Sequence, residues 1–278
     1  MDTYNRAAEA AARSVMKQFS TSFGLATRLF GASIRQDIYN IYGLVRIADE
    51  IVDSYKGDDS AKLLDALERE TKSAVATGYS TNVIVHAYCL TARRYQIKPD
   101  LMEAFFVSMR ADLKPETYKS SDYEKYIYGS AEVVGLMCLA VFCQGDAALY
   151  EHLRPGARAL GAAFQKVNFL RDMAADYKEL GRYYFPIGSY DNFDEATKKT
   201  IIKDISADFI TARTAIEQLP ASARPAVLAA YRYYLELLNK LTITPATEIK
   251  SSRVRVSNGR KAVIFAGTGL RHKFRRAA

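Results

Sequence analysis

Apolar residues recur at intervals of three and four along most of the chain, which is the spacing of one face of an α-helix. The pattern is clearest in residues 61–75, 99–113 and 224–241. Short polar stretches rich in Gly, Pro, Ser and Asp separate such segments. No stretch alternates cleanly enough to predict a β-strand. The pattern therefore predicts roughly ten helices of ordinary length, ~11–12 residues each.

The same pattern indicates a single folding unit. No long Ser/Gly-rich linker and no repeat of fixed period divides the chain, so we expect one all-α domain over residues 1–278. Pro99, Pro155 and Pro225 stand where helices can begin in their first turn. Residues 132–143 and 161–173 are apolar most of the way round, as central helices are. A large helical domain with such helices can enclose a central cavity.

Charge and hydropathy narrow the range of partners. The net charge is +8, with basic residues concentrated near the C-terminal end, which suits anionic partners such as phosphorylated small molecules or anionic membranes. No basic-aromatic module is present, so we expect no nucleic acid partner. The longest apolar run, residues 133–143, is about half of the ~20 residues that a membrane span needs.

The cysteines indicate a reducing compartment. Cys89, Cys138 and Cys143 are odd in number and form no CxxC pair, so neither a disulfide framework nor a zinc site is predicted. The three histidines lie far apart. The N-terminal stretch contains acids and no apolar core, unlike a secretory signal. We expect a cytoplasmic protein.

One helical segment carries a stripe of oxygen-bearing side chains. Asn168, Asp172 and Asp176 are spaced four and four, which stacks them on one face of a helix. Gln165 and Arg171 lie beside them. The rest of the segment is apolar. Like charges at this spacing repel, more so when partly buried, and a bound cation would relieve the repulsion.

A second segment, VRIADEIVD at residues 45–53, repeats this arrangement. Asp49 and Asp53 lie one turn apart, with Arg46 one turn ahead of them. Two such stripes inside apolar segments suggest the facing walls of a cavity. Oxygen ligands suit Mg²⁺ or Mn²⁺, whose shell phosphate oxygens often complete. Nearby arginines would grip the same phosphates. The implied ligand is a diphosphate with an apolar tail.

The competing interpretation is an ordinary salt-bridged surface. Acids at this spacing with an arginine nearby are usually of that kind, and either cluster alone would favour it. Both clusters together, with Asn168 and Gln165 in register and apolar surroundings, favour the cavity. Glu50 lies about 100° of helix rotation away from the Asp49–Asp53 stripe and is left out of the metal set.

At these residues the chain resembles the squalene/phytoene synthase family, all-α enzymes that join two isoprenoid diphosphates head to head. RIADEIVD and QKVNFLRDMAADYKELGRYYFP resemble the family's two aspartate-rich motifs. FSTSF, from Phe19, resembles a segment that contacts a diphosphate, and YIYGSAEVVGLM, from Tyr126, a cavity-lining helix. RVRVSNGRK, from Arg253, resembles the basic segment near the family's C-terminus.

The resemblance implies roles for single residues. The metal would be held by Asp49, Asp53, Asn168, Asp172 and Asp176, and Tyr184 with the four aspartates would serve catalysis. The implied substrate-binding residues are Ser20, Ser22, Phe23, Tyr42, Arg46, Tyr126, Ala131, Val134, Gly135, Gln165, Arg171, Arg182 and Arg255. Gly135 could equally serve close helix packing, Ser20 and Ser22 could cap a helix, and Tyr42 and Tyr126 could be core aromatics.

The chain departs from the family pattern in two places. Gly181 stands directly before Arg182, in a region where the family varies in length. The chain also ends without the hydrophobic anchor of the membrane-bound eukaryotic squalene synthases.

The residues of these motifs are most similar to those of bacterial phytoene synthases. The resemblance thus implies condensation of two geranylgeranyl diphosphates to phytoene in carotenoid biosynthesis, through a cyclopropylcarbinyl intermediate. Mg²⁺ or Mn²⁺ would be the cofactor, and NADPH is not expected. Squalene or dehydrosqualene synthesis from two farnesyl diphosphates is the alternative. The basic tail could serve peripheral contact with a membrane. The oligomeric state stays open.

Other classes of function remain. A non-catalytic family member acting as an assembly factor would be expected to have lost the acids, and all five metal-side residues are present. The second remaining class is a terpene cyclase that uses a single diphosphate substrate.

Overall fold

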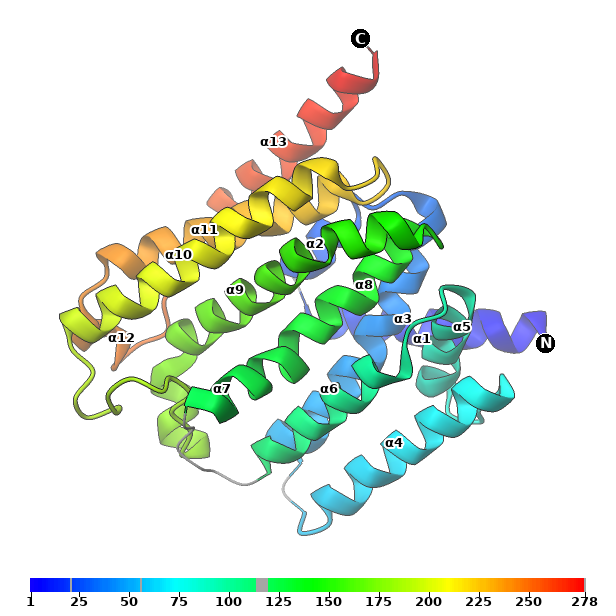
Figure 1. Cartoon of the computed structure of the whole chain (residues 1–278), viewed down its shortest axis with the longest axis horizontal. Coiled ribbons are helices and arrows are strands. Elements are labelled where there is room, and N and C mark those ends of the chain that lie inside the picture. Colours follow the sequence, from blue (N-terminus) through cyan, green and yellow to red (C-terminus); the bar gives the residue numbers. More distant parts are fainter. Residues whose placement is uncertain (21, 56, 114–119, 278) are drawn as a thin grey trace.

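Helices make up the part of the chain that the structure describes, as the apolar pattern predicts. The structure is a computed structural model that describes residues 1–20, 22–55, 57–113 and 120–277, without the side chains of residues 22–23, 120–121 and 269–277. The five helices that run next to one another across Figure 1 are α10 (Glu195–Gln218), α9 (Ala147–Leu180), α8 (Val133–Cys143), α6 (Pro99–Asp112) and α4 (Ser60–Thr77). They form one layer of a helical domain.

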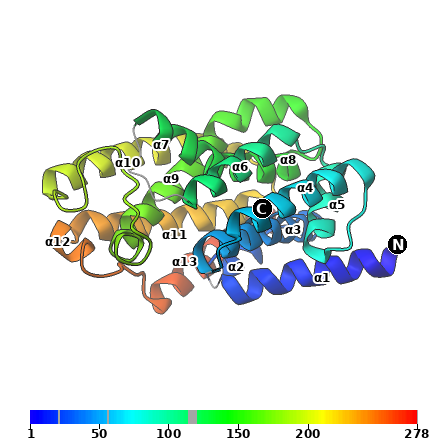
Figure 2. The same cartoon turned by 90° about the horizontal axis from the view of Figure 1, so that it is seen from below.

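A second group of helices packs against this layer. It comprises α1 (Asp2–Phe19), α3 (Ala32–Asp49), α5 (Val83–Arg94) and α11 (Arg224–Ile243). In Figure 2, α3 and α11 lie beneath α8 and α9, and they contact these helices directly. The shorter or peripheral elements are α2 (Ser22–Thr27), η1 (Glu50–Ser54), α7 (Ser120–Ile127), η2 (Tyr128–Glu132), α12 (Ala246–Ile249) and α13 (Asn258–Ala277).

The long helix α9 crosses the whole domain. Asp146 caps its N-terminus, where Oδ1 accepts a hydrogen bond from the N–H of Leu149 (2.9 Å). It ends at Gly181, whose φ of 67° suits glycine and lets its N–H donate to the Tyr177 carbonyl (3.1 Å). Pro155 lies inside α9, so the prediction of a helix start there is wrong. Packing of α9 along α10 keeps the helix continuous despite the lost backbone donor.

Glycines allow α8 and α9 to approach each other closely. A Cβ on Gly161 of α9 would lie 2.7 Å from the Ala131 carbonyl oxygen, and one on Gly135 of α8 would lie 2.9 Å from that of Ala157. A side chain at either position would force the backbones apart. Close packing therefore explains the glycine at position 135, which the sequence left open between packing and room for a ligand.

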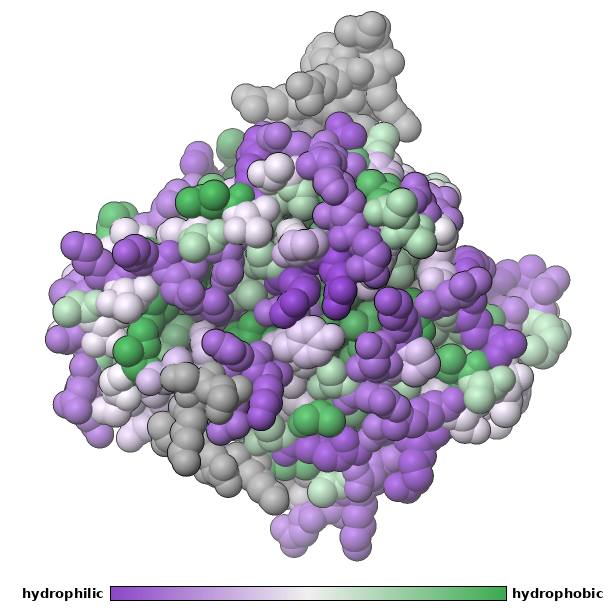
Figure 3. Space-filling view, viewed as in Figure 1, coloured by the Kyte–Doolittle hydropathy of each residue, from purple (hydrophilic) through white to green (hydrophobic). Residues whose placement is uncertain are grey.

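The apolar segment before Cys143 lies in the core. Among the described residues, one helical stretch, Asp122–Cys143, is long and apolar enough to cross a membrane by length and composition alone. In the fold, 61% of its tested window is buried against other helices, and a core helix passes the same test. The face shown in Figure 3 is mainly polar with small scattered apolar patches, as is usual for a protein surface.

A buried polar network joins α3 to α5 away from these central helices. Asp37 is 1% exposed, and its carboxylate accepts hydrogen bonds from Thr91 Oγ1 (2.9 Å), Arg94 Nη1 (3.1 Å) and Tyr95 Oη (3.0 Å). A buried carboxylate is stable only with such partners. Asp37 is therefore explained as a structural residue that fixes α3.

We expect Gly161→Ala to lower the free energy of unfolding by ~1–3 kcal/mol, because the new Cβ overpacks the backbone of η2. Gly259→Ala on α13 is the matched control, since nothing lies within 4 Å of a Cβ there. That change should leave stability unchanged or raise it by up to ~1 kcal/mol through better helix propensity. Urea unfolding of both variants measures this, and equal effects would contradict the close packing of η2 on α9.

Candidate active site

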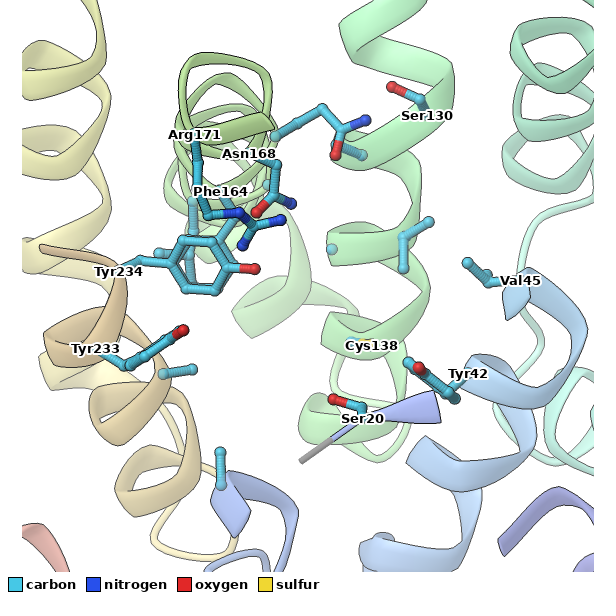
Figure 4. A pocket seen from close by; sticks show the side chains of 18 of the residues that line it. Ser20, Tyr42, Val45, Ser130, Cys138, Phe164, Asn168, Arg171, Tyr233 and Tyr234 are labelled. Atoms are coloured by element: carbon cyan, nitrogen blue, oxygen red, sulfur yellow. The ribbon is translucent and has the colours of Figure 1, made fainter. Parts of the chain in front are cut away.

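A cavity of about 1190 Å³ lies between the two groups of helices. Figure 4 shows side chains of α3 and α8 on one side facing those of α9 and α11 on the other. Polar residues near the C-terminal ends of α3 and α9 line one end of it. Apolar residues from the C-terminal end of α8 and the N-terminal end of α9 line the other. The cavity thus has a charged end, called its mouth below, and an apolar interior.

The cavity brings together the residues that the sequence singled out. Those that line it are Ser20, Tyr42, Arg46, Asp49, Asp53, Tyr126, Ala131, Val134, Gly135, Gln165, Asn168, Arg171, Asp172, Asp176, Arg182, Tyr184 and Arg255. The side chains of the other two candidates, Ser22 and Phe23, lie outside the described residues. The hypothesis of facing walls requires this placement, while the roles of single residues stay predictions.

Two π-helical turns shape the walls. Asp49 ends α3, and Asp53 lies in η1, where the N–H of Tyr55 donates to the carbonyl of Glu50 (3.0 Å) five residues earlier. The second π turn, η2, lies in the YIYGSAEVVG segment, where the N–H of Val133 donates to the Tyr128 carbonyl. Such turns are frequent at functional sites. Both fall in the motifs, and neither is predicted by the apolar pattern.

Arginines pair with the acids on both walls. Arg182 Nη1 lies 2.8 Å from Asp53 Oδ1 and so ties the segment after α9 to η1. Arg253 Nε lies 2.7 Å from Asp172 Oδ1, and Arg171 also pairs with Asp172. Within the described chain, no three His, Cys, Asp or Glu side chains gather closely enough to hold a metal by themselves. The acids form two half-sites bridged by guanidinium groups.

Asp49 and Asp176 are costly to ionise in their buried positions. Burial raises the pKa of Asp49 to about 7, and the nearby charge of Asp53 adds to the effect. Burial and the charge of Asp172 likewise raise the pKa of Asp176 to about 7. Both shifts arise mainly because burial disfavours the charged carboxylate, and the neighbouring carboxylate adds to this cost. An added cation would relieve this.

The donor set fits Mg²⁺ or Mn²⁺. The five candidate ligands all offer oxygen, which these hard cations prefer. Asn168 Oδ1 is buried without a hydrogen-bond partner in the described structure, although such atoms are nearly always satisfied. An oxygen of this kind beside carboxylates of raised pKa suits a cation. Two half-sites leave coordination positions for the oxygens of a ligand.

Arg46 takes a position between the wall and the solvent. It forms an ion pair with Glu50, the acid outside the metal set, and its guanidinium lies 4.6 Å from the ring centroid of Phe19. Its Nε is buried without a hydrogen-bond partner in the described part of the chain. Arg46 therefore has donor capacity left at the cavity mouth, in keeping with its predicted contact to phosphate.

The structure adds cavity residues that the sequence did not single out. Asp112 is buried at the end of α6, and burial raises its pKa to about 7. Tyr234 on α11 stacks on Phe164 at 4.0 Å, and Arg253 reaches Asp172. Asp112 belongs to no motif, and the irregular segment around Arg253 gives no periodic signal to separate it from Arg255. The Tyr pair in RYYLELL, Tyr233 and Tyr234, is half-buried and has the spacing of ordinary core aromatics.

Apolar side chains from several helix ends close the far end of the cavity. Phe142 of α8 stacks on Phe30 at 5.4 Å between ring centroids, and both are buried. Leu153 of α9 and Leu219 complete this floor. The N–H of Gly31 donates to the Ser222 carbonyl (2.8 Å), which fixes the loop that carries Phe30. The far end of the cavity is thus closed by packed apolar side chains, and a backbone hydrogen bond holds the loop behind them.

Comparison with known proteins identifies a family. The family model "Squalene/phytoene synthase" matches residues 16–260. The chain is 34% identical to phytoene synthase 3, chloroplastic, of Zea mays over 176 residues, covering 62% of this chain and 41% of that protein. It is 27% identical to 4,4'-diapophytoene synthase of Staphylococcus haemolyticus, covering 70% and 67% of the two chains. The chain spans about half the length of the first curated relatives it matches.

A solved structure shares the fold. A dehydrosqualene synthase in complex with ligand superposes with a TM-score of 0.83 over 97% of this chain and 98% of that one, at 21% identity. A likeness at this identity concerns the fold, and it confirms the all-α isoprenoid synthase architecture that the sequence predicts.

We expect Asp176→Asn to stabilise the metal-free protein at high pH. Folded Asp176 binds its proton up to pH about 7, whereas an unfolded Asp titrates near ~3.9. The folded state therefore binds more protons between these pH values, and the contribution of Asp176 to stability falls as pH rises. In EDTA, the variant should melt above the wild type at pH 8 and together with it near pH 4.

The exposed Asp191 supplies the control for this comparison. Asp191→Asn should shift the melting temperature little at either pH. Thermal melts followed by circular dichroism give the result. An Asp176→Asn difference that is the same at pH 4 and pH 8 would show that ionisation of Asp176 does not oppose folding.

Proposed function

The chain belongs to the squalene/phytoene synthase family, and we propose that it condenses two geranylgeranyl diphosphates head to head into phytoene. Members of this family are prenyltransferases, which sets the enzyme class. The observation that carries the proposal is the pairing of two facing carboxylate walls with a long apolar cavity. A diphosphate fits the first and a prenyl chain fits the second.

The residues that would hold Mg²⁺ or Mn²⁺ are Asp49, Asp53, Asn168, Asp172 and Asp176. When bound, the metal would neutralise the diphosphate and so favour loss of this leaving group. The protein contributes arginines to the same end. Arg171, Arg182 and Arg253 pair with the acids in the described structure and would turn to phosphate once the acids have a cation. The arginines would thus pair with carboxylates in the metal-free state and with phosphate in the loaded state.

The apolar interior performs the second task of the site. Loss of diphosphate leaves an allylic cation, which water would quench. Packed walls such as the Phe30–Phe142 floor exclude water from the far end of the cavity. Aromatic faces near the mouth, including Phe164 and Tyr234, can stabilise a cation by about 0.5–2 kcal/mol each. A double bond of the second prenyl chain then attacks the cation, and loss of a proton closes the ring to give a cyclopropylcarbinyl diphosphate. Loss of its diphosphate, rearrangement and loss of a second proton follow.

The length of the cavity leaves room for a C20 substrate. About 28 Å of helix separates Leu153 at the floor from Asp172 at the mouth, at a rise of about 1.5 Å per residue. A geranylgeranyl chain reaches about 20 Å and a farnesyl chain about 15 Å, if each C–C bond of about 1.5 Å advances the chain by about 1.25 Å. The cavity can thus take the longer chain above its floor.

Condensation of two farnesyl diphosphates to dehydrosqualene or squalene is the second candidate. Its support is the 27% identity to a 4,4'-diapophytoene synthase. The retained acids of both walls speak against a non-catalytic assembly factor. The proposal includes no role for NADPH. It places the reaction in the cytoplasm at a membrane surface, because the hydrocarbon product is insoluble in water and the basic region after Arg253 suits anionic lipids.

The deciding experiment offers the purified protein C15 and C20 diphosphates with Mg²⁺ or Mn²⁺, with and without NADPH. Mass spectrometry of the extracted products should show a C40 hydrocarbon from the C20 substrate, unaffected by NADPH. Asp49→Asn and Asp172→Asn should lower turnover by about 10²-fold or more, because charge on the departing diphosphate is then poorly balanced.

The other outcomes separate the alternatives. A C30 product, formed from the C15 substrate and with no product from the C20 substrate, would favour synthesis of dehydrosqualene or squalene over synthesis of phytoene. A product with the carbon number of its substrate would point to a cyclase. No product under any metal condition would favour the assembly factor.

Substrate length should respond to a block in the cavity wall. Cys138 lies about 18 Å from the level of Tyr126 along the helical stretch that α7, η2 and α8 form, at about 1.5 Å per residue, and it faces the cavity between mouth and floor. We expect Cys138→Phe to raise the preference for C15 over C20 diphosphate by about tenfold or more, since the last isoprene unit loses its space. Cys138→Ala, which blocks nothing, should keep the original preference. The ratio of kcat/KM values measures this, and an unchanged ratio in Cys138→Phe would contradict the assigned path of the chain.

A further inference from the structure

Asp112 is a buried carboxylate that packing does not explain. Its side chain is 4% exposed, and it ends α6, where the helix dipole disfavours negative charge. Burial raises its pKa. An aspartate that is costly both to bury and to place at a helix C-terminus is a poor choice for stability. It lines the cavity, so its partners there matter.

The main partner of Asp112 is the hydroxyl of Tyr126. Tyr126 Oη donates to Asp112, at 2.8 Å from both carboxylate oxygens. Tyr184 Oη also donates to Oδ1, at 3.5 Å. Hydrogen bonds to a charged acceptor are stronger than those between neutral groups. The proton of the Tyr126 hydroxyl is therefore directed at Asp112.

The surroundings hold this pair in one arrangement. Tyr126 stacks on Tyr184 at 5.4 Å, and Tyr184 stacks on Phe169 of α9 at 3.9 Å. Arg182 donates from Nη2 to the backbone carbonyl of Asp112 (2.8 Å), a contact that does not depend on the aspartate side chain. Arg182 Nη1 also forms an ion pair with Asp112 Oδ1 (3.9 Å), so a change at the carboxylate loses this ion pair and keeps the backbone anchor of the α6 end.

We propose that Asp112 is a positioning residue that fixes the polarity of the Tyr126 hydroxyl toward the prenyl chain. With its proton held by Asp112, the hydroxyl turns the negative end of its dipole to the cavity. A positive charge that develops on the chain is then stabilised without reorganisation. The inference rests on the proposed function, since it needs a cationic intermediate in this cavity.

The chain contains a matched control. Asp37 is an equally buried aspartate that accepts a hydrogen bond from a tyrosine, Tyr95, and lies beside an arginine, Arg94. Asp37 does not line the cavity. Asp37→Asn and Asp112→Asn therefore remove the same chemistry from two places, of which only one lines the cavity.

Asp112→Asn should lower kcat by about tenfold to a hundredfold, the worth of a hydrogen bond to a charged group. The amide can donate to Tyr126 Oη and so turn the hydroxyl proton toward the cavity. KM for the diphosphate should change less than threefold, because the arginines at the mouth remain. Asp37→Asn should keep kcat within about twofold of the wild type at a temperature below its melting point, even where it melts earlier. A kcat for Asp112→Asn equal to that of Asp37→Asn overturns the proposal.

Tyr126→Phe tests the same hydrogen bond from the other side, and it serves even if Asp112→Asn does not fold. It should show the same selective loss of kcat, and the double variant should be no slower than Tyr126→Phe alone, because Asp112 acts through Tyr126. An unchanged kcat in Tyr126→Phe, or multiplying effects in the double variant, would sink the inference. A wild type that makes no product would remove the proposed function and with it this inference, whereas an active wild type with an unaffected Asp112→Asn removes the inference alone.

Discussion

Repulsion between carboxylates at the mouth of the cavity is the constraint on which the rest of the structure depends. The acids of α3 and η1 face those of α9 in a partly buried space, where like charges cost more than at a surface. Arg182 and Arg253 pair with two of these acids, and burial together with the neighbouring carboxylates raises the pKa values of Asp49 and Asp176. Such a site persists only in a fold with a large apolar core to offset it. The continuous core around α8 and α9 is that counterweight.

Rigid helices fix the positions of the acids on both walls of the site. The walls of the site lie on or directly after the long helices α3 and α9, and the backbone of α9 in turn packs closely on η2 at Gly161. Where an ordinary helix would aim a side chain wrongly, the π turns η1 and η2 shift it, and both fall beside the cavity. A site held by helices is more precise than one held by loops. The same rigidity lets the floor at Phe142 limit the length of a ligand.

The sequence predicted the parts of this arrangement that follow from periodicity. A stripe such as Asn168–Asp172–Asp176 is visible because four-residue spacing fixes a helix face, and the apolar flanks indicated that the stripe faces inward. Features that depend on contacts between distant residues were beyond reach. Pro155 looked like a helix start because local rules cannot include the packing of α9 on α10. Asp112 carried no signal because its partner is Tyr126, which is 14 residues later and on another helix. Nothing in the sequence shows that these two side chains form a hydrogen bond.

Asp112 and Asp37 show why burial alone cannot identify a functional acid. Both are almost fully buried, and both accept a hydrogen bond from a tyrosine. Asp37 sits inside α3 with three donors on α5 and just beyond it, a set that links two helices and needs no further explanation. Asp112 stands at a helix C-terminus, against the dipole, and its donors are aromatic residues of the cavity wall. A chain selected for stability alone would place an amide or an apolar residue there. The retained charge is best explained by what it does to the hydroxyl in front of it.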